Sequence, residues 1–179
     1  MAVENSSVIS RFATLNTVFQ SADANTGEGA LGWWPDEGVN ESFVIDLNVK
    51  DATMKLKDGQ TVPAMSVQFI YQLMQDPGAP DGTPRRWNGA PFLFPADLSA
   101  ISDEKTQTRI RMETERIKGH LKVILRRDPK DLPAALTDCA KRVADASNPV
   151  AVRVNCQYDK NPVTGKTYKK EFIQSALSQ

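Results

Sequence analysis

The segment from Pro149 to Gln179 constrains the fold most, because its residues alternate in character with a period of two. In its first half, one set of alternate positions is Val150, Val152, Val154, Cys156 and Tyr158, and the other is Ala151, Arg153, Asn155 and Gln157. This period predicts a strand with one buried face. Residues 159–165 are rich in turn formers, and residues 166–174 resume the alternation. We therefore predict that the chain ends in a hairpin, which its lysines make basic.

Two earlier segments carry the same signal and are joined by a turn. Residues 41–57 open with alternating apolar side chains at Phe43, Ile45, Leu47 and Val49. Residues 65–73 alternate in the same way, and the Asp58-Gly59 dipeptide between the two segments is a hairpin signal. The proline- and glycine-rich residues 77–84 then predict a loop, which leads to a third strand around residues 85–94.

Helical periodicity separates these strands from the last hairpin. From Ser102, a possible N-cap, apolar side chains recur at helical spacing up to residue 127, and a second helix is predicted over about 131–146. An amphipathic helix near the N-terminus is predicted by the spacing of Val8, Phe12, Leu15 and Phe19. The residues from Ser21 to Gly32 are small and polar, which indicates a flexible connection.

Three strands, a helical region and two further strands follow one another in the order of an OB barrel. We therefore predict an α+β fold that is mainly β: a five-stranded OB-fold barrel with a helical insertion between strands 3 and 4, at about residues 102–146, and an N-terminal helical arm. The expected organisation is a helix and flexible arm at residues 1–38, followed by one OB-fold domain at residues 39–179.

Charge is balanced over the whole chain but segregated along it. The 179 residues include 22 basic and 22 acidic side chains, so the formal net charge is zero. This balance excludes a general attraction to polyanions, and any nucleic-acid surface must come from local clusters. Residues 1–46 are acidic, with Arg11 as their only Lys or Arg, whereas residues 105–127 are mostly basic. A solvated helical face is the commonest explanation of such a basic segment.

Little in the sequence points to catalysis, so we predict a protein that is not an enzyme and that uses no cofactor or metal. His120 is the only histidine, it lies among lysines of a predicted helix, and we expect it at the surface. No nucleophile motif accompanies it. Asp46 and Asp51 are the carboxylates that a two-metal nuclease could use, but a regular strand places them on opposite faces. A metal-dependent nuclease is therefore a weak alternative.

The cysteines and the lengths of the apolar runs indicate where in the cell the protein is located. Cys139 and Cys156 are isolated and lack metal-ligand spacing, so we predict reduced thiols in the core rather than a disulfide. The sequence contains no apolar run near the ~20 residues of a spanning helix, and no signal-peptide layout. We therefore expect a soluble, cytoplasmic protein without a membrane partner.

Aromatic and basic residues occur together at two places, the Arg85-Arg86-Trp87 segment and the last hairpin. This combination favours binding of single-stranded nucleic acid, because bases stack on flat rings and the backbone needs cations along a groove. In an OB barrel, the loops of the first and last hairpins border one ligand cleft, so these distant clusters are expected to converge. The candidate contacts are Lys50, Lys55, Lys57, Tyr71, Arg85, Arg86, Trp87, Arg153, Lys160, Lys166, Tyr168 and Lys169.

Several of these candidates also have a purely structural explanation. Trp87 can seal the core, Tyr168 can extend it, and lysines such as Lys169 can protect a sheet edge from aggregation. Of Trp33 and Trp34, we expect at least one to cap the barrel rather than to stack on a base.

With these segments, the chain resembles the phage-encoded OB-fold single-stranded DNA-binding proteins over most of residues 39–176. The resemblance rests on the strand order, on helices placed before the fourth strand, and on the hairpin with Gly165-Lys166-Thr167-Tyr168. It implies non-enzymatic, largely sequence-independent binding of single-stranded DNA during phage DNA replication and recombination, in the host cytoplasm. It also implies replisome or recombination proteins as partners. The contacts that it implies are Arg85, Arg86, Trp87, Lys166, Tyr168 and Lys169.

One departure from that family keeps other functions open. Many such proteins end in an acidic tail that recruits partners, whereas this chain ends without acidic residues after Glu171. An OB-fold protein-interaction module or a virion component is therefore the alternative, and zero net charge suits it. The N-terminal helix can mediate self-association, so a homo-oligomer is a further expectation.

Overall fold

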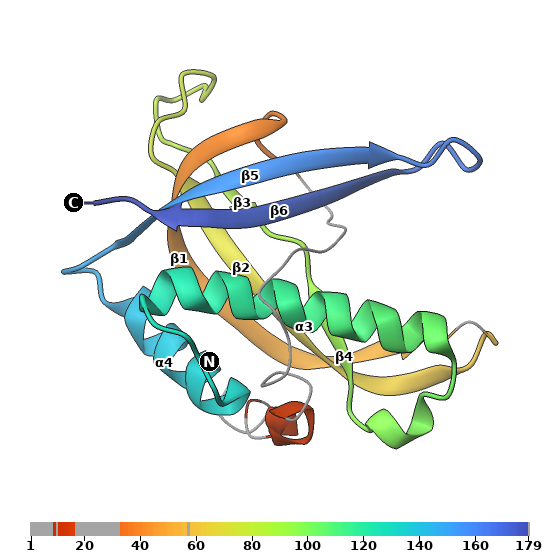
Figure 1. The fold of residues 1–179 in the computed structure, drawn as a ribbon. Helices are drawn as coiled ribbons and strands as arrows, with labels where there is room; N and C mark the ends of the chain where they lie inside the picture. Colours follow the sequence, from red (N-terminus) through yellow and green to blue (C-terminus); the bar gives the residue numbers. More distant parts are fainter. Residues whose placement is uncertain (1–8, 10, 17–32, 57, 179) are drawn as a thin grey trace.

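The computed structural model describes residues 9, 11–16, 33–56 and 58–178. In chain order, its elements are the 3₁₀ helix η1 (Arg11–Leu15), β1 (Gly38–Lys55), β2 (Thr61–Leu73), β3 (Arg86–Asn88), β4 (Phe92–Pro95), the 3₁₀ helix η2 (Leu98–Ala100), α3 (Glu104–Leu125), α4 (Leu132–Ala144), β5 (Val150–Lys160) and β6 (Thr167–Ala176). The fold is α+β and mainly β, as the sequence predicted, and both α-helices lie between β4 and β5 in the chain (Figure 1).

The six strands form one antiparallel sheet in the order β3-β2-β1-β5-β6, with β4 also paired to β2. The long strand β1 uses both of its edges, because residues 42–55 pair with β2 and residues 38–44 pair with β5. Its register shifts between Val44 and Asp46, where the pairing to β5 ends. Such irregularities bend and twist a strand, and Figure 1 shows β5 and β6 running across the direction of β1 and β2.

The third strand expected around residues 85–94 is two short strands, and the sheet is not closed. Pro91, which separates them, has no N–H for a ladder. Gly89 packs so tightly that an added Cβ would lie 2.6 Å from Glu171 Oε1 and 3.1 Å from the Phe69 carbonyl oxygen. In the part of the chain that the structure describes, no ladder joins β6 to β3 or β4. In place of the expected five-stranded OB-fold barrel, the structure has a six-stranded antiparallel sheet that is not closed.

Aspartates cap both α-helices. Asp103 Oδ1 accepts a hydrogen bond from the Thr106 N–H at 2.8 Å, and Asp131 Oδ1 accepts one from the Ala134 N–H at 2.7 Å. The cap of α3 is therefore one residue later than Ser102, the position expected from the sequence. The two helices occupy the insertion predicted at about residues 102–146.

Near the N-terminus, the structure describes only part of the predicted amphipathic helix. Phe12 and Leu15 belong to η1 and are fully buried. Val8 and Phe19 lie outside the described residues, as does the predicted flexible connection from Ser21 to Gly32. Among the expectations for this region, only the burial of Phe12 and Leu15 is confirmed.

The core lies between the inner face of the sheet and the two helices. In Figure 1, α3 crosses in front of β1, β2 and β4 and runs below β6. Leu47 and Val49 alternate into this core, as predicted. Phe43 and Ile45 are only half-buried, and Val44 lies in the core instead, because the register shift between Val44 and Asp46 interrupts the period of two. Cys139 and Cys156 are buried free thiols, as predicted, and burial raises the pKa of each to about 12.

Candidate nucleic-acid interface

The β5–β6 hairpin carries the densest group of predicted contacts. Glu171 of β6 is fully buried, so the period of two puts Lys169 on the inner face of the hairpin and Tyr168 on its outer face. Directly paired residues share a face. Tyr158 therefore accompanies Lys169, and Asp159 accompanies the half-buried Tyr168.

The tip of this hairpin is an ordered turn flanked by two exposed cations. Asn161 Oδ1 accepts hydrogen bonds from the N–H groups of Val163 and Thr164, at 2.9 and 3.0 Å. An asparagine side chain that bonds the following backbone in this way stabilises a tight turn. Lys160 and Lys166 are exposed at its two ends.

The segment 33–35 crosses the inner side of the hairpin. Lys169 Nζ lies 5.8 Å from the ring centroid of Trp34 and 5.5 Å from that of Tyr158. The Tyr158 hydroxyl donates a hydrogen bond to the Pro35 carbonyl oxygen. Trp34 is buried, so of the two adjacent indoles this one is not exposed for stacking on a base. The hairpin is thus anchored to the segment that leads into β1.

Trp33, in contrast, is 39% exposed and is held by an arginine. The Arg85 guanidinium carbon lies 3.9 Å from the Trp33 ring centroid. The same guanidinium donates to Asp76 through Nε–Oδ2 at 2.6 Å and Nη2–Oδ1 at 2.7 Å. These hydrogen bonds lower the pKa of Asp76 to about 2. Arg85 therefore supports the Trp33 ring, and its guanidinium is already paired with a carboxylate.

Trp87 and Tyr71 are not the exposed platforms that the sequence analysis assigned. Trp87 is 2% exposed and Tyr71 is fully buried. Their rings stack with centroids 4.3 Å apart and planes at 18°, and Trp34 packs on Trp87 at 4.9 Å. Burial and the nearby Glu171 raise the pKa of Tyr71 well above its ordinary value. Both rings are buried because of the β2–β3 register, which places Trp87 opposite Tyr71 on the inner face of the sheet.

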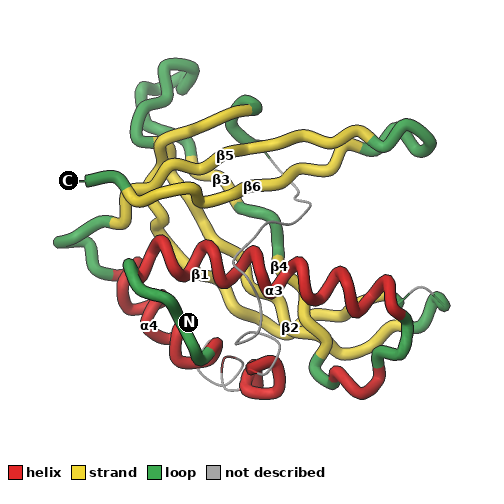
Figure 2. The backbone as a smooth tube through the Cα atoms, viewed as in Figure 1, coloured by secondary structure: helices red, strands yellow, loops and turns green. Residues whose placement is uncertain are grey.

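The remaining predicted contacts that the structure describes lie on β1, on β3 and in the first part of β5. The exposed ones are Lys50, Lys55, Arg86 and Arg153. Arg153 Nε forms an exposed ion pair with Glu41 Oε1 at 3.2 Å. Lys57 lies outside the described residues. Figure 2 shows the turn of the β5–β6 hairpin and the end of the β1–β2 hairpin at the same side of the molecule, with the start of α3 beside the β1–β2 hairpin. Contacts through residues 33–34 link Arg85 to Lys169, whereas Lys50 and Lys55 belong to a separate hairpin.

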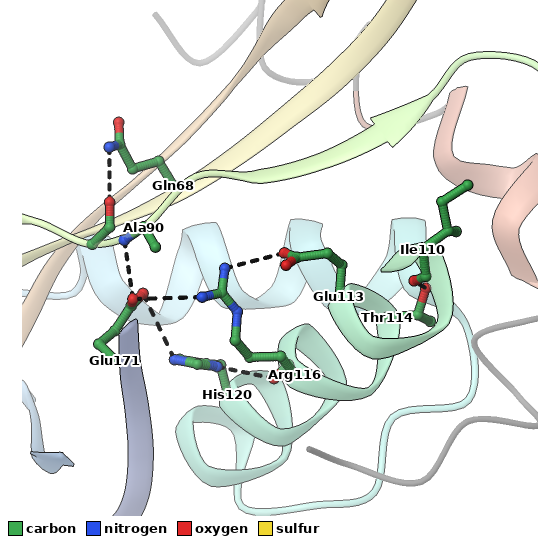
Figure 3. A network of polar contacts seen from close by, with 9 residues as sticks. Gln68, Ala90, Ile110, Glu113, Thr114, Arg116, His120 and Glu171 are labelled. Carbon is green, nitrogen blue, oxygen red and sulfur yellow. Dashed lines mark hydrogen bonds and ion pairs between the residues drawn. The ribbon is translucent and has the colours of Figure 1, made fainter. Parts of the chain in front are cut away.

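A buried polar network, shown in Figure 3, ties β6 to α3 and to the β3–β4 connection. Glu171 Oε2 accepts a hydrogen bond from the Ala90 N–H at 3.0 Å and lies 3.7 Å from Arg116 Nη1. Arg116 Nη2 donates to Glu113 Oε2 at 3.2 Å, and its guanidinium carbon lies 3.7 Å from the Phe92 ring centroid. This network fixes the strand that carries Tyr168 and Lys169. Sequence reasoning missed it, because helical spacing alone assigns Arg116 to a solvated basic face.

His120 belongs to the same region, so its predicted surface position is wrong. It is 2% exposed, and its ring stacks on Phe69 with centroids 5.3 Å apart. Its Nδ1 donates to the Arg116 carbonyl oxygen at 2.9 Å, which leaves Nε2 facing Glu171 Oε1 at 4.0 Å. Burial and the Arg116 charge lower the pKa of His120 to about 3, so the ring is neutral at pH 7. The sequence did contain a signal for the burial of His120: the adjacent Leu121 lies in the apolar stripe of the helix.

The buried carboxyl group of Glu171 should make stability depend on pH. Burial raises the pKa of Glu171 from 4.5 to about 7, although the adjacent Arg116 acts in the opposite direction. The folded state then binds more protons than the unfolded state between these two values, so this group's contribution to stability is lost as pH rises from about 4.5 to 7. His120 has the opposite sign, since its contribution is lost as pH falls from 6.5 towards 3.

Glu171→Gln is therefore expected to reduce the loss of stability between pH 5 and pH 8 by roughly 1–3 kcal/mol, because an amide keeps the Ala90 hydrogen bond and does not titrate. Urea unfolding at both pH values measures this difference. An equal pH dependence in the wild-type protein and the variant would show that Glu171 is already ionised at pH 5.

The carboxylates considered for metal chemistry lie apart. Asp46 Oδ1 accepts a hydrogen bond from the Leu47 N–H at 2.8 Å, and Asp51 forms an ion pair with Arg11. Their partners in the register, Ile70 and Met65, place them on opposite faces of β1. Within the described ranges, no group of three or more His, Cys, Asp or Glu side chains is close enough to hold a metal ion.

Comparison with known proteins adds no assignment. A scan against protein-family models, a search of curated proteins and a search of solved structures each found no match to this chain. None of the helices in the described residues is long and apolar enough to cross a membrane.

Proposed function

We propose that this chain is a non-enzymatic protein that binds single-stranded DNA with little sequence preference, in phage DNA replication or recombination. We further propose that its sheet is an OB-like barrel left open at one seam. The order β5-β1-β2-β3 supports this reading, because it is the 4-1-2-3 order of a Greek key, on which the OB fold is built. The open seam lies between β6 and the β3–β4 connection. There the Ala90 N–H donates a hydrogen bond to the Glu171 side chain, in place of a backbone ladder.

The observation that carries the proposal is the grouping of aromatic rings and cations beside the last hairpin. The exposed Trp33 ring lies on Arg85, and Lys169 lies beside the buried Trp34. Tyr168 is half-buried on the outer face of the hairpin, and Lys166 is exposed at the tip. Rings for base stacking and amines for phosphates are the two requirements of sequence-tolerant binding to a single strand.

The first test is a fluorescence anisotropy titration of labelled oligothymidine at low and high salt, with duplex DNA of equal length as competitor. We expect oligothymidine binding to weaken as salt rises, because phosphate contacts release counterions. We also expect duplex DNA to be a poor competitor of the labelled oligothymidine. Absence of binding at low salt would refute the proposal. A salt-insensitive complex with a protein would then favour the protein-interaction alternative.

Trp33→Ala and Tyr168→Ala are each expected to cost about 1–3 kcal/mol of oligothymidine binding, because each would remove a stacking ring. Anisotropy titrations measure the loss, and circular dichroism checks that the variants are folded. Phenylalanine at either position is the matched control, since it keeps a flat ring and should retain most of the affinity. Unchanged affinity in folded alanine variants would remove the substituted residue from the interface.

A further inference from the structure

A groove with a volume of about 640 Å³ lies between the end of the first hairpin and the first half of α3. Its apolar lining includes Leu56, which is half-buried, and Met112, which is 46% exposed. Met112 is one of the few large hydrophobic side chains that the described residues expose. A flexible thioether at an exposed position is typical of surfaces that accommodate varied apolar side chains. The groove is of a size that holds a few residues of a peptide.

Three cations surround this apolar lining. They are Lys55 from β1 and Lys105 and Arg109 from α3, and Glu104 is the one acidic residue of the lining. In the part of the chain that the structure describes, no ion pair involves any of these three cations. Their positive charge is therefore left to attract an anionic partner.

The edge of β1 beside the groove offers backbone hydrogen-bonding groups as well. Next to the groove, residues 52–55 of β1 pair with β2 along one edge, and among the described residues no ladder occupies their other edge. This part of β1 runs to Lys55, which lines the groove. An extended peptide can add to such an edge through main-chain hydrogen bonds, while pockets beside the edge select its side chains.

We propose that this groove binds an extended acidic peptide of a partner protein, which inserts an apolar side chain between Leu56 and Met112. The acidic residues of the peptide pair with Lys105, Arg109 and Lys55. A peptide fits better than a nucleic acid, because the lining contains no aromatic ring on which a base could stack. This site is separate from the proposed DNA interface and would give the protein a means of recruiting another protein.

The test is selection of a displayed library of random dodecapeptides on the full-length protein, followed by fluorescence polarisation of the selected peptides. We expect enriched sequences in which Asp or Glu flank a large apolar residue. Arg109→Glu should weaken their binding at least tenfold, because it replaces an attractive charge with a repulsive one. Met112→Ser and the milder Arg109→Gln should weaken it less. Lys122→Glu is the matched control, since it changes an exposed cation in the last turn of the same helix.

Three outcomes would overturn the proposal. One is a selection without acidic enrichment, and another is binding of the selected peptides that Arg109→Glu leaves unchanged. The third is a loss of oligothymidine binding in Arg109→Glu when no acidic peptide is enriched, because the groove would then belong to the DNA path. The proposed DNA binding stands or falls on the wild-type titration, so the two proposals can fail separately.

Discussion

Replacing Arg116 with alanine is expected to destabilise the protein by about 3–5 kcal/mol. The change would leave the Glu171 carboxyl group buried without its cation and would remove the ion pair of Arg116 with Glu113. Removing one member of a buried pair costs far more than removing an exposed one. It would also remove the guanidinium that packs on the Phe92 ring. Urea unfolding at pH 8 measures the change in the free energy of unfolding. A smaller loss is expected at pH 5.5, because Glu171 can then take up a proton.

Arg111→Ala is the matched control for that experiment, because it makes the same change on the same helix. The Arg111 side chain is 65% exposed and lies 3.8 Å from Glu115, so its loss should change stability by no more than about 0.5 kcal/mol. The double variant Arg116→Met, Glu171→Gln should recover part of the lost stability, since it removes the charge of Glu171, the more deeply buried of the two carboxyl groups that Arg116 contacts. A loss below about 1 kcal/mol in Arg116→Ala would show that the buried network does not hold β6 in place.

Trp87→Ala is expected to cost about 3–5 kcal/mol of stability, the usual range for truncating a buried large aromatic side chain. The variant would lose the stack on Tyr71 and the contact with Trp34, and it would leave a cavity at the inner face of the sheet. Thermal or urea unfolding measures this loss. Trp33→Ala should cost much less stability, because the Trp33 side chain is partly solvated.

The two tryptophans should therefore separate stability from binding. At a temperature where Trp87→Ala remains folded, its oligothymidine affinity should equal that of the wild-type protein, whereas Trp33→Ala should bind more weakly. The opposite pattern would restore Trp87 as a contact and would mean that the inner face of the sheet opens when DNA binds.

Most secondary structure followed from local periodicity. The alternating residues of 150–158 and 166–174 form β5 and β6, and helical spacing after Ser102 located α3. These predictions succeeded because strand and helix periods are properties of neighbouring residues. The split of the third strand was missed, because it depends on how closely Gly89 approaches Phe69 and Glu171, which are distant in the sequence.

The candidate site was predictable only in part. The basic hairpin was visible in the sequence, and the exposed positions of Lys160 and Lys166 agree with it. The sequence grouped Arg85 with Trp87, but Trp87 is buried, and the ring that Arg85 contacts is Trp33. Charge and aromatic content identify a kind of surface, whereas the choice among similar side chains depends on long-range packing.

By itself, the sequence determined the strands, the two inserted helices, the reduced core cysteines and the basic character of the last hairpin. Only the tertiary structure decided which rings and charges are accessible. The crossing of α3 beneath β6 buries Arg116 and His120, although lysines flank His120 in the sequence. The register of β2 and β3 buries Trp87 and Tyr71. The physical reason is that burial depends on which elements pack together, and the pattern within one element does not specify its partners.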